Sequence, residues 1–185
     1  MENPEPLPAF RYHPDPLGTG AIAANPDQPC LGCSRIRGYI YMGPVSTEKN
    51  FILDEHLCPW CIADGSAAKR FSATFNDTGV AEGIPDAVRA EIEQRTPGYT
   101  GWQQERWMAC CGDGAEFLGV AGKRELERDF QEAVAVVKKH LRDEFDLSKA
   151  DAEDFFDGLS KDGEPSAYVF RCLHCKKYLA YVDEA

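Results

Sequence analysis

The sequence predicts an α+β fold: a treble-clef-like zinc module, a helical body, and a C-terminal β-hairpin whose turn is a zinc knuckle. Three observations support this fold class. Two C-x-x-C pairs lie within residues 30–61, on either side of short strand-like segments. Apolar residues recur at three- and four-residue steps over 123–145, as in an amphipathic helix. Residues 166–183 alternate between apolar and polar on both sides of a third C-x-x-C, as in a hairpin.

These patterns divide the chain into three regions. We predict a proline-rich extended arm over 1–29, the treble-clef-like zinc module over 30–75, and the helical body with its closing hairpin over 76–185. A chain of 185 residues can form one substantial core with a small module attached. No long linker separates the regions, so we expect the module and the body to pack as one compact unit.

The arm is predicted from its prolines, because proline lacks an amide hydrogen and blocks helix formation. Seven prolines lie between residues 4 and 29. The same segment carries apolar side chains that would anchor it across the body, namely Leu7, Phe10, Tyr12 and Leu17.

The module is predicted from two strand-like stretches and a helix. The stretches "GYIYMG" (38–43) and "FILDEHL" (51–57) indicate short strands that flank a turn. The stretch "IADGSAAKRF" (62–71) indicates a helix that follows the second C-x-x-C pair. Knuckle, hairpin and helix in this order are typical of a treble clef.

The body is predicted to be mostly helical. Helices are expected over 84–95, over 100–111 with Thr100 as a possible cap, and over 123–145. Ser148 is expected to cap a further helix that Gly158 closes, since Asp151 follows Ser148 at capping-box spacing. The hairpin of 166–183 then ends the chain.

The first two C-x-x-C pairs predict a structural zinc site. Structural zinc takes four ligands tetrahedrally, with Zn–S bonds of about 2.3 Å. The predicted ligands are Cys30, Cys33, Cys58 and Cys61. Basic residues that would offset the charge of four thiolates lie nearby, at Arg35, Arg37, Lys69 and Arg70. The alternatives are a redox-active dithiol at 58–61, or two pairs of buried thiols.

A second, tentative zinc site would use the third C-x-x-C. Its predicted ligands are Cys111, Cys172 and Cys175, with Cys110, His174 or Asp113 as the fourth. Adjacent residues on a helix point about 100° apart, so Cys110 and Cys111 would both reach one ion only at a frayed helix end. The alternative is that Cys110 and Cys111 are small core residues.

The charge of the chain indicates the kind of partner it would bind. The formal net charge is −11, and residues 143–164 hold nine acidic against two basic residues. This charge argues against general binding to nucleic-acid phosphates, because such binding needs a basic surface. A basic protein, such as a bacterial toxin, could bind the acidic residues Asp143, Glu144, Asp146, Asp151, Glu153, Asp154 and Asp157.

Two other groups of residues are weaker candidates. His13 and Asp15, held between prolines, could form an acid–base pair of an enzyme, although a solvated arm is the simpler interpretation. Trp102, Gln103 and Trp107 could line a recognition surface, although tryptophans are more often part of a core. No complete catalytic motif is present, so we expect no catalytic residues. Without a signal peptide or an apolar stretch of bilayer length, we expect a cytoplasmic location.

The sequence also resembles the CbrC family of bacterial proteins. The stretches that carry the resemblance are "LPAFRYHPDPLGTGAI", "CLGCSRIRGYIYMGP", "LCPWCIADGSAAKRFSATF", "RTPGYTGWQQERW" and "YVFRCLHCKKYLAYVD". They extend from Leu7 to Asp183, and residues 112–164 match only loosely. The resemblance implies a small cytosolic protein with an association with colicin tolerance, hence an immunity-like role. Members of that family often have histidine where this chain has Cys110, which is compatible with a zinc ligand there. Where they tend to have a further cysteine downstream, this chain has "GDGAEF".

Together these observations predict a non-enzymatic, zinc-stabilised binding protein that sequesters a basic protein through its acidic face. An enzyme that uses His13 and Asp15 is the first alternative. A nucleic-acid binder that uses its zinc modules is the second.

Overall fold

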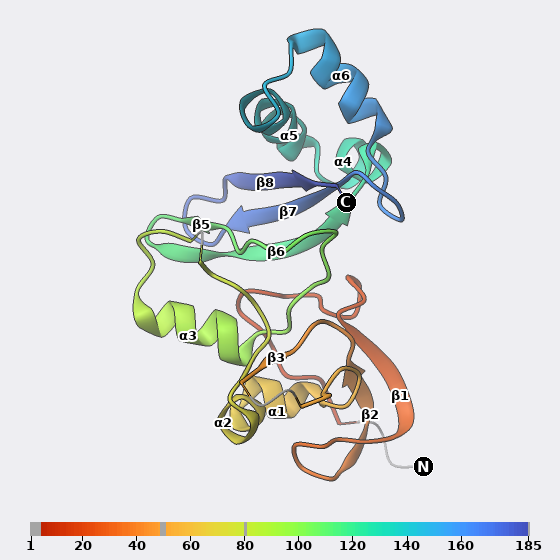
Figure 1. Ribbon diagram of the computed structural model, residues 1–185, viewed down its shortest axis with the longest axis vertical. Coiled ribbons are helices and arrows are strands. Elements are labelled where there is room, and N and C mark those ends of the chain that lie inside the picture. Colours follow the sequence, from red (N-terminus) through yellow and green to blue (C-terminus); the bar gives the residue numbers. More distant parts are fainter. Residues whose placement is uncertain (1–4, 49–50, 80, 185) are drawn as a thin grey trace.

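The computed structural model describes residues 5–48, 51–79 and 81–184, and it has mixed helix and sheet (Figure 1). We call residues 22–75 the N-terminal half. It holds β1 (Ile22–Pro29), β2 (Ile36–Tyr41), β3 (Ser46–Thr47), α1 (Pro59–Ala63), α2 (Ser66–Phe71) and β4 (Ala73–Thr74). We call residues 109–183 the C-terminal half. It holds β5 (Ala109–Cys110), β6 (Asp113–Ala121), α4 (Lys123–Asp129), α5 (Gln131–Glu144), α6 (Lys149–Gly158), β7 (Ser166–Cys172) and β8 (Tyr178–Asp183). The linking segment between them carries α3 (Asp86–Arg95).

The last eight residues of the predicted arm form strand β1 instead of an unpaired extended segment. This strand pairs antiparallel with β2, from Ile22 opposite Tyr41 to Pro29 opposite Ile36. The register shifts between Asn25 and Pro29, which is where prolines can enter a strand without breaking a ladder of hydrogen bonds. The part of the arm before residue 5 lies outside the described residues.

The prediction of a strand over 51–57 is wrong, because this stretch forms no strand in the described structure. The partner of β2 precedes the first C-x-x-C in the chain, so the knuckle is itself the turn of the hairpin. The helix predicted over 62–71 is instead two short helices. They meet at Gly65, which adopts a left-handed conformation (φ 75°) that ends α1.

The C-terminal half is built on a four-stranded antiparallel sheet with the order β5-β6-β7-β8. The hairpin predicted over 166–183 is confirmed as β7 and β8. The helix predicted over 100–111 is wrong, because that stretch forms bends and then β5. Strand β6, an inner strand of the sheet, was not predicted. Its residues are nearly all buried, so they show no alternation between polar and apolar.

The helix predicted over 123–145 forms as two helices that meet at Phe130, whose backbone is not helical (φ −129°, ψ 43°). Its apolar face is confirmed, since Leu126, Ala133, Val137 and Leu141 are fully buried. The predicted helix over 84–95 forms as α3, and Ser148 caps α6 by accepting a hydrogen bond from the amide of Asp151. No described helix is both long enough and apolar enough to cross a membrane.

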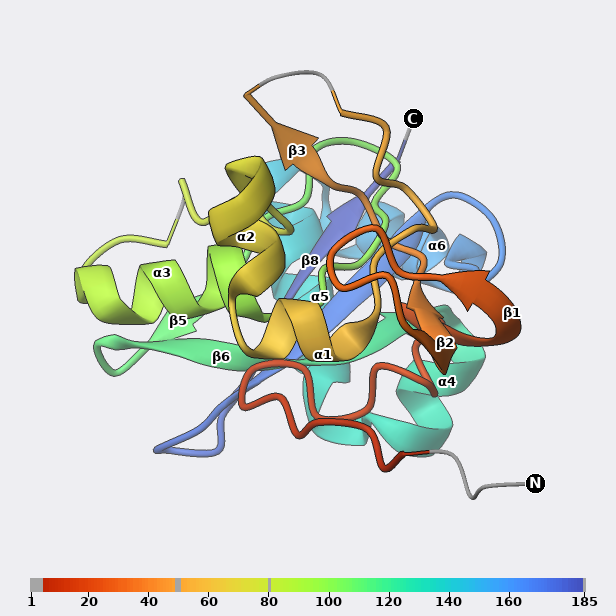
Figure 2. The ribbon, with the colours of Figure 1, turned by 90° about the horizontal axis from the view of Figure 1, so that it is seen from below.

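The two halves lie at opposite ends of the long axis, with the sheet between the N-terminal half and the helices α4–α6 (Figure 1). Seen from below, along that axis, α1 and α2 lie in front of the sheet (Figure 2). A cluster of buried aromatic residues joins the arm and the linking segment to the sheet. It includes Tyr12 of the arm, Tyr99 and Trp107 of the linking segment, and Phe117 and Phe170 of the sheet. Phe117 stacks on Tyr99 with ring centres 4.1 Å apart.

Candidate metal centres

The first cysteine cluster consists of Cys30, Cys33, Cys58 and Cys61, whose Sγ atoms all lie within 4.8 Å of one another. The Sγ atoms of Cys30 and Cys61 are 3.8 Å apart, as are those of Cys33 and Cys58. A disulfide would need about 2.05 Å. A tetrahedron with Zn–S bonds of about 2.3 Å has S–S edges of about 3.8 Å, which is the observed spacing.

The turn between β1 and β2 positions the first pair of this cluster. The amide of Cys30 donates to the carbonyl of Arg35 (3.0 Å), and the amide of Ser34 donates to the carbonyl of Cys30 (2.7 Å). Ser34 takes a left-handed conformation (φ 59°) to close this knuckle. Gly32 suits this crowded position, because a Cβ there would lie 3.1 Å from the sulfur of Cys61, a tight contact.

The start of α1 positions the second pair. Cys58 precedes the helix and Cys61 lies in its first turn, with Pro59 at the first helical position. The amides of Gly32 and Cys58 each donate a hydrogen bond to the sulfur of Cys30 at 3.2 Å. Hydrogen bonds with Cys58 and Cys61 lower the pKa of Cys30, so one thiolate of the cluster forms easily.

Two of the four predicted basic residues support the first cluster. Arg37 is largely buried, stacks over Trp60 at 4.5 Å and binds the carboxylate of Glu5 with two hydrogen bonds. Burial alone would lower the pKa of Arg37, but hydrogen bonds to Cys58 and Glu5 raise it. Arg70 donates to the carbonyl of Gly32 (2.8 Å), inside the knuckle.

The second cluster consists of Cys110, Cys111, Cys172 and Cys175, whose Sγ atoms also lie within 4.8 Å of one another. The sulfur of Cys110 lies 3.7 Å from those of Cys111 and Cys175. The adjacent cysteines meet because they lie on a tight β-turn rather than on a helix. Cys110 pairs with Asp113, and Cys111 and Gly112 both have positive φ (55° and 72°), as in a type I′ turn.

The knuckle between β7 and β8 repeats the hydrogen bonds of the first knuckle. The amide of Cys172 donates to the carbonyl of Lys177 (2.9 Å), and the amide of Lys176 donates to the carbonyl of Cys172 (3.2 Å). Lys176 is left-handed (φ 60°), like Ser34 in the first knuckle. Burial would raise the pKa of Cys172, but the backbone amides of Cys175 and His174 lower it to about 6.

Cys110 completes the second cluster, and the other two predicted fourth ligands bind each other instead. Asp113 accepts hydrogen bonds from His174 (2.8 Å), Arg11 (2.6 Å) and Tyr12 (2.7 Å). Burial would raise the pKa of Asp113, but these hydrogen bonds hold it below its usual value. Asp113 thus connects the arm to the rim of the second cluster.

The structure does not pair His13 with Asp15. The ring of His13 is fully buried, with Nδ1 donating to the carbonyl of Pro97 (2.8 Å) and Nε2 lying 2.7 Å from the hydroxyl of Thr19. Asp15 instead accepts the amide of Gly18 (2.9 Å) in an exposed turn. The two residues are therefore parts of separate local structures rather than an acid–base pair.

The burial of His13 predicts a pH-dependent stability. Burial lowers its pKa from 6.5 to about 4, so unfolding takes up a proton between these values. The free energy of unfolding should fall by about 3 kcal/mol as the pH falls through this window. Denaturant titrations of His13→Gln should show a weaker pH dependence than the wild type. Equal pH dependences for the wild type and His13→Gln would contradict this account.

The predicted recognition residues of the linking segment have structural contacts. Trp107 is fully buried, and its indole donates to the carbonyl of Ala115 (3.0 Å). Trp102 is 45% exposed, and its indole donates to the hydroxyl of Ser166 (3.1 Å). The amide of Gln103 donates to Asp183 (2.7 Å). These residues attach the linking segment to the sheet.

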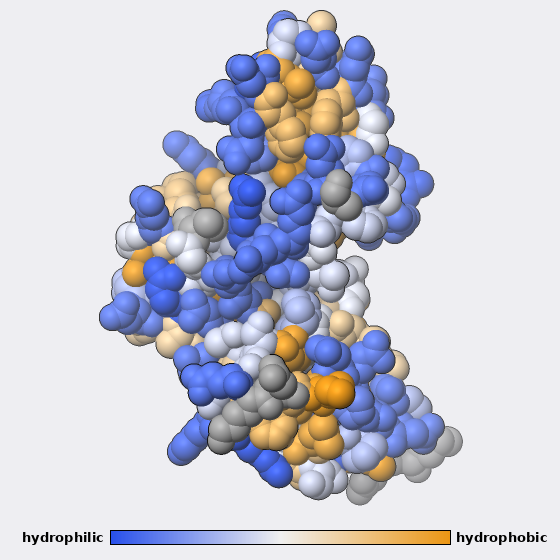
Figure 3. Space-filling view, in the orientation of Figure 1, coloured by the Kyte–Doolittle hydropathy of each residue, from blue (hydrophilic) through white to orange (hydrophobic). Residues whose placement is uncertain are grey.

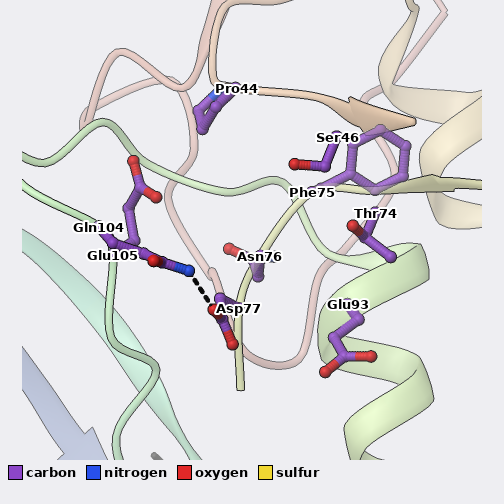
Figure 4. A pocket seen from close by; sticks show the side chains of 9 residues that line it. All are labelled: Pro44, Ser46, Thr74, Phe75, Asn76, Asp77, Glu93, Gln104 and Glu105. Carbon is purple, nitrogen blue, oxygen red and sulfur yellow. Dashed lines mark hydrogen bonds between the residues drawn. The ribbon is translucent and has the colours of Figure 1, made fainter. Parts of the chain in front are cut away.

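A polar cavity of about 270 Å³ lies between the N-terminal half and the linking segment (Figure 4). Its walls include Asp77, Glu93, Gln104 and Glu105. Gln104 donates to Asp77 across the cavity, and the amide of Trp107 donates to the carbonyl of Asp77 (3.2 Å). None of the four stands out in the sequence, because isolated polar residues without a motif carry no signal of a shared cavity. The hydrogen bonds to Asp77 join the linking segment to itself along one wall of the cavity.

The predicted acidic face lies on α5, α6 and their connection, at the end of the molecule where hydrophilic side chains surround a small apolar patch (Figure 3). Four of its seven residues form ion pairs within the chain. The pairs are Asp143 with Lys139, Glu144 with Arg106, Glu153 with Lys138, and Asp157 with Lys123. Asp151 accepts the hydroxyl of Ser148 (2.6 Å). The face therefore offers less free charge than its composition indicates.

Comparison with known proteins identifies a family that matches nearly the whole chain. The model of the uncharacterised protein family UPF0167 matches residues 7–184. A UPF0167 protein of Mycobacterium bovis is 47% identical over 184 residues, which cover 98% of this chain and 96% of the relative. A UPF0167 protein of Pseudomonas aeruginosa is 43% identical over 173 residues, which cover 92% and 93%. No solved structure matches the chain.

These findings correct the resemblance to the CbrC family. The matching family model is that of UPF0167, and the relatives carry the name of that family. The immunity-like role rested on the resemblance, so it loses that support.

Proposed function

We propose that this chain, which belongs to the UPF0167 family, is a non-enzymatic, zinc-stabilised binding protein with two tetrathiolate sites. The observation that carries the proposal is the spacing of the sulfur atoms. In both clusters four thiols converge, with S–S distances of 3.7–3.8 Å that fit a tetrahedral zinc ion. The proposed first site is treble-clef-like, because a knuckle and the start of a helix supply its four ligands.

Zinc fits these donors better than the alternatives. Tetrahedral sets of four thiolates suit zinc or iron, whereas harder ions prefer oxygen ligands. A redox dithiol at 58–61 fits less well, because Cys58 and Cys61 are close to the sulfurs of Cys33 and Cys30 rather than poised as a separate pair. When bound, zinc would supply cross-links between segments that are distant in sequence. The thiolates would bind it, and the knuckle amides and Arg37 would stabilise the thiolates of the first site by hydrogen bonds.

The proposed partner is a basic protein, such as a bacterial toxin, bound at the acidic residues of 143–157. The net charge of −11 supports an attraction of this sign. The ion pairs of Asp143, Glu144, Glu153 and Asp157 lower the charge available for it. Nucleic acid is a poorer partner, because Arg37 and Arg70 already serve the first cluster.

Elemental analysis of the purified protein tests the metal sites. We expect two zinc ions per chain and little iron, because each cluster supplies a complete set of four ligands. Cys61→Ser and Cys172→Ser should each reduce the content to one ion, and the double variant should hold none. An absence of zinc, together with a reversible disulfide between Cys58 and Cys61, would contradict the proposal and favour redox chemistry.

A further inference from the structure

We infer that the second cluster is a metal-exchange site, which passes its zinc ion to and from thiolate-bearing partners, while the first cluster retains its ion. The inference rests on the proposed function, because both clusters must hold metal. The two clusters have the same donor atoms and the same knuckle. Their difference lies in the exposure of the ligands and in the groups around them.

The exposure of the ligands differs sharply between the clusters. Cys30, Cys58 and Cys61 are 1–2% exposed, and only Cys33 is partly accessible. In the second cluster Cys111 and Cys175 are exposed, Cys110 is partly accessible and only Cys172 is buried. An incoming ligand can therefore reach an ion in the second cluster from solvent. In the first cluster the surrounding protein would block most of that approach.

The groups that contact the sulfur atoms also differ between the clusters, and this difference too favours release of the ion from the second cluster. In the first cluster the sulfur of Cys30 accepts two backbone amides, and the Arg37 guanidinium lies against Cys58. In the second cluster the contacts to the sulfur of Cys172 come from the amide of Cys175, at the longer distance of 3.4 Å, and from the amide of His174. Such outer contacts strengthen metal binding, so the second cluster should release its ion more readily.

The place of each cluster in the fold determines how much the loss of its ion would disturb the folded structure. Three cysteines of the first cluster belong to the hydrophobic core of the N-terminal half, so losing its ion would disrupt that core. The second cluster lies at the tips of two hairpins. The sheet behind those tips is held by pairing along β6, β7 and β8 and by its own buried side chains. The C-terminal half can therefore remain folded without the ion.

The exchange itself is a ligand substitution. A thiolate of the partner forms a bond to zinc as the bond to Cys111 breaks, and the displaced thiolate takes a proton from solvent. Repeating the step at the other ligands transfers the ion, and no atom is oxidised or reduced. The partner bears thiolates, on a small thiol or in a cysteine cluster of another protein. Thiolates are soft donors, so they can compete with the cysteines of the site for this ion.

Chelator competition on the zinc-loaded full chain tests the inference. The chromophoric chelator 4-(2-pyridylazo)resorcinol, in excess, should remove one equivalent of zinc at least about tenfold faster than the other. Cys111→Ser should abolish or accelerate the fast phase and leave the slow phase unchanged. Cys33→Ser, the matched change at the most accessible ligand of the first cluster, should affect the slow phase only.

Transfer is tested by mixing the zinc-loaded protein with a zinc-free peptide that carries four cysteines. We expect one equivalent to move to the peptide, with the circular dichroism of the protein nearly unchanged. Two equivalents that leave at one rate, or a fast phase that Cys33→Ser alters and Cys111→Ser does not, would overturn the inference. A purified protein without zinc would instead contradict the proposed function, so the two failures can be told apart.

Discussion

Replacing Cys58 by serine should unfold the N-terminal half and remove one zinc ion. Structural zinc contributes about 10–16 kcal/mol to the folding of small zinc domains, so losing one ligand should lower the free energy of unfolding by at least about 4 kcal/mol. Cys58 is 1% exposed and belongs to the same core as Leu57 and Ile62, so the damage reaches the packing as well. Hydrogen exchange should show lost protection in β1, β2 and α1, while β6, β7 and β8 remain protected.

The matched control for this variant is Arg35→Ala, which changes an exposed residue beside the first knuckle. Its side chain is 63% exposed and lies 3.8 Å from Glu5, so the change should cost less than about 0.5 kcal/mol. Elemental analysis should find both zinc ions in the control. A Cys58→Ser protein with two zinc ions and wild-type exchange in β1 and β2 would show that the first cluster does not stabilise this half.

Truncating Phe117 to alanine should lower the free energy of unfolding by about 3–5 kcal/mol, the range for large aromatic residues in a core. Phe117 is 1% exposed and belongs to the cluster that joins the arm and the linking segment to the sheet. Its ring stacks on Tyr99 and contacts His13 edge-on, with ring centres 5.1 Å apart. The cavity would therefore open where the arm, the linking segment and the sheet meet.

Phe51→Ala provides the comparison for this variant, because the chemical change is identical. Phe51 is 45% exposed and makes one edge-on contact with Phe71, so we expect a loss of less than about 1 kcal/mol. Chemical denaturation followed by tryptophan fluorescence measures both variants, since Trp107 lies in the affected cluster. Similar losses for the two variants would show that the aromatic cluster does not hold the arm and the linking segment against the sheet.

Spacing and periodicity were enough to predict several parts of the structure. The C-x-x-C spacing identified both knuckles, because two sulfurs three residues apart can face one ion with little help from the rest of the chain. The buried face of 123–145 followed from its helical period, and the cap at Ser148 followed from local chemistry. The β7–β8 hairpin is likewise local, with its partners adjacent in sequence.

The errors have a common physical cause, which is pairing between segments that the sequence does not mark as partners. Residues 22–29 became β1 because β2 supplies its hydrogen bonds, although prolines argued for an arm. Strand β6 was missed because burial on both sides removes alternation. Phe130 interrupts a helical pattern that is otherwise continuous, and nothing in the local sequence marks that break.

The sequence by itself indicated the candidate metal ligands among its eight cysteines, and its local patterns predicted α3, the capped α6 and the β7–β8 hairpin. Only the tertiary structure decided that Cys110 and Cys111 share one site, because that depends on a turn closed by pairing between β5 and β6. It also decided that one cluster is buried and the other accessible. Burial depends on what packs around a residue, and that is set by contacts across the whole chain rather than by spacing.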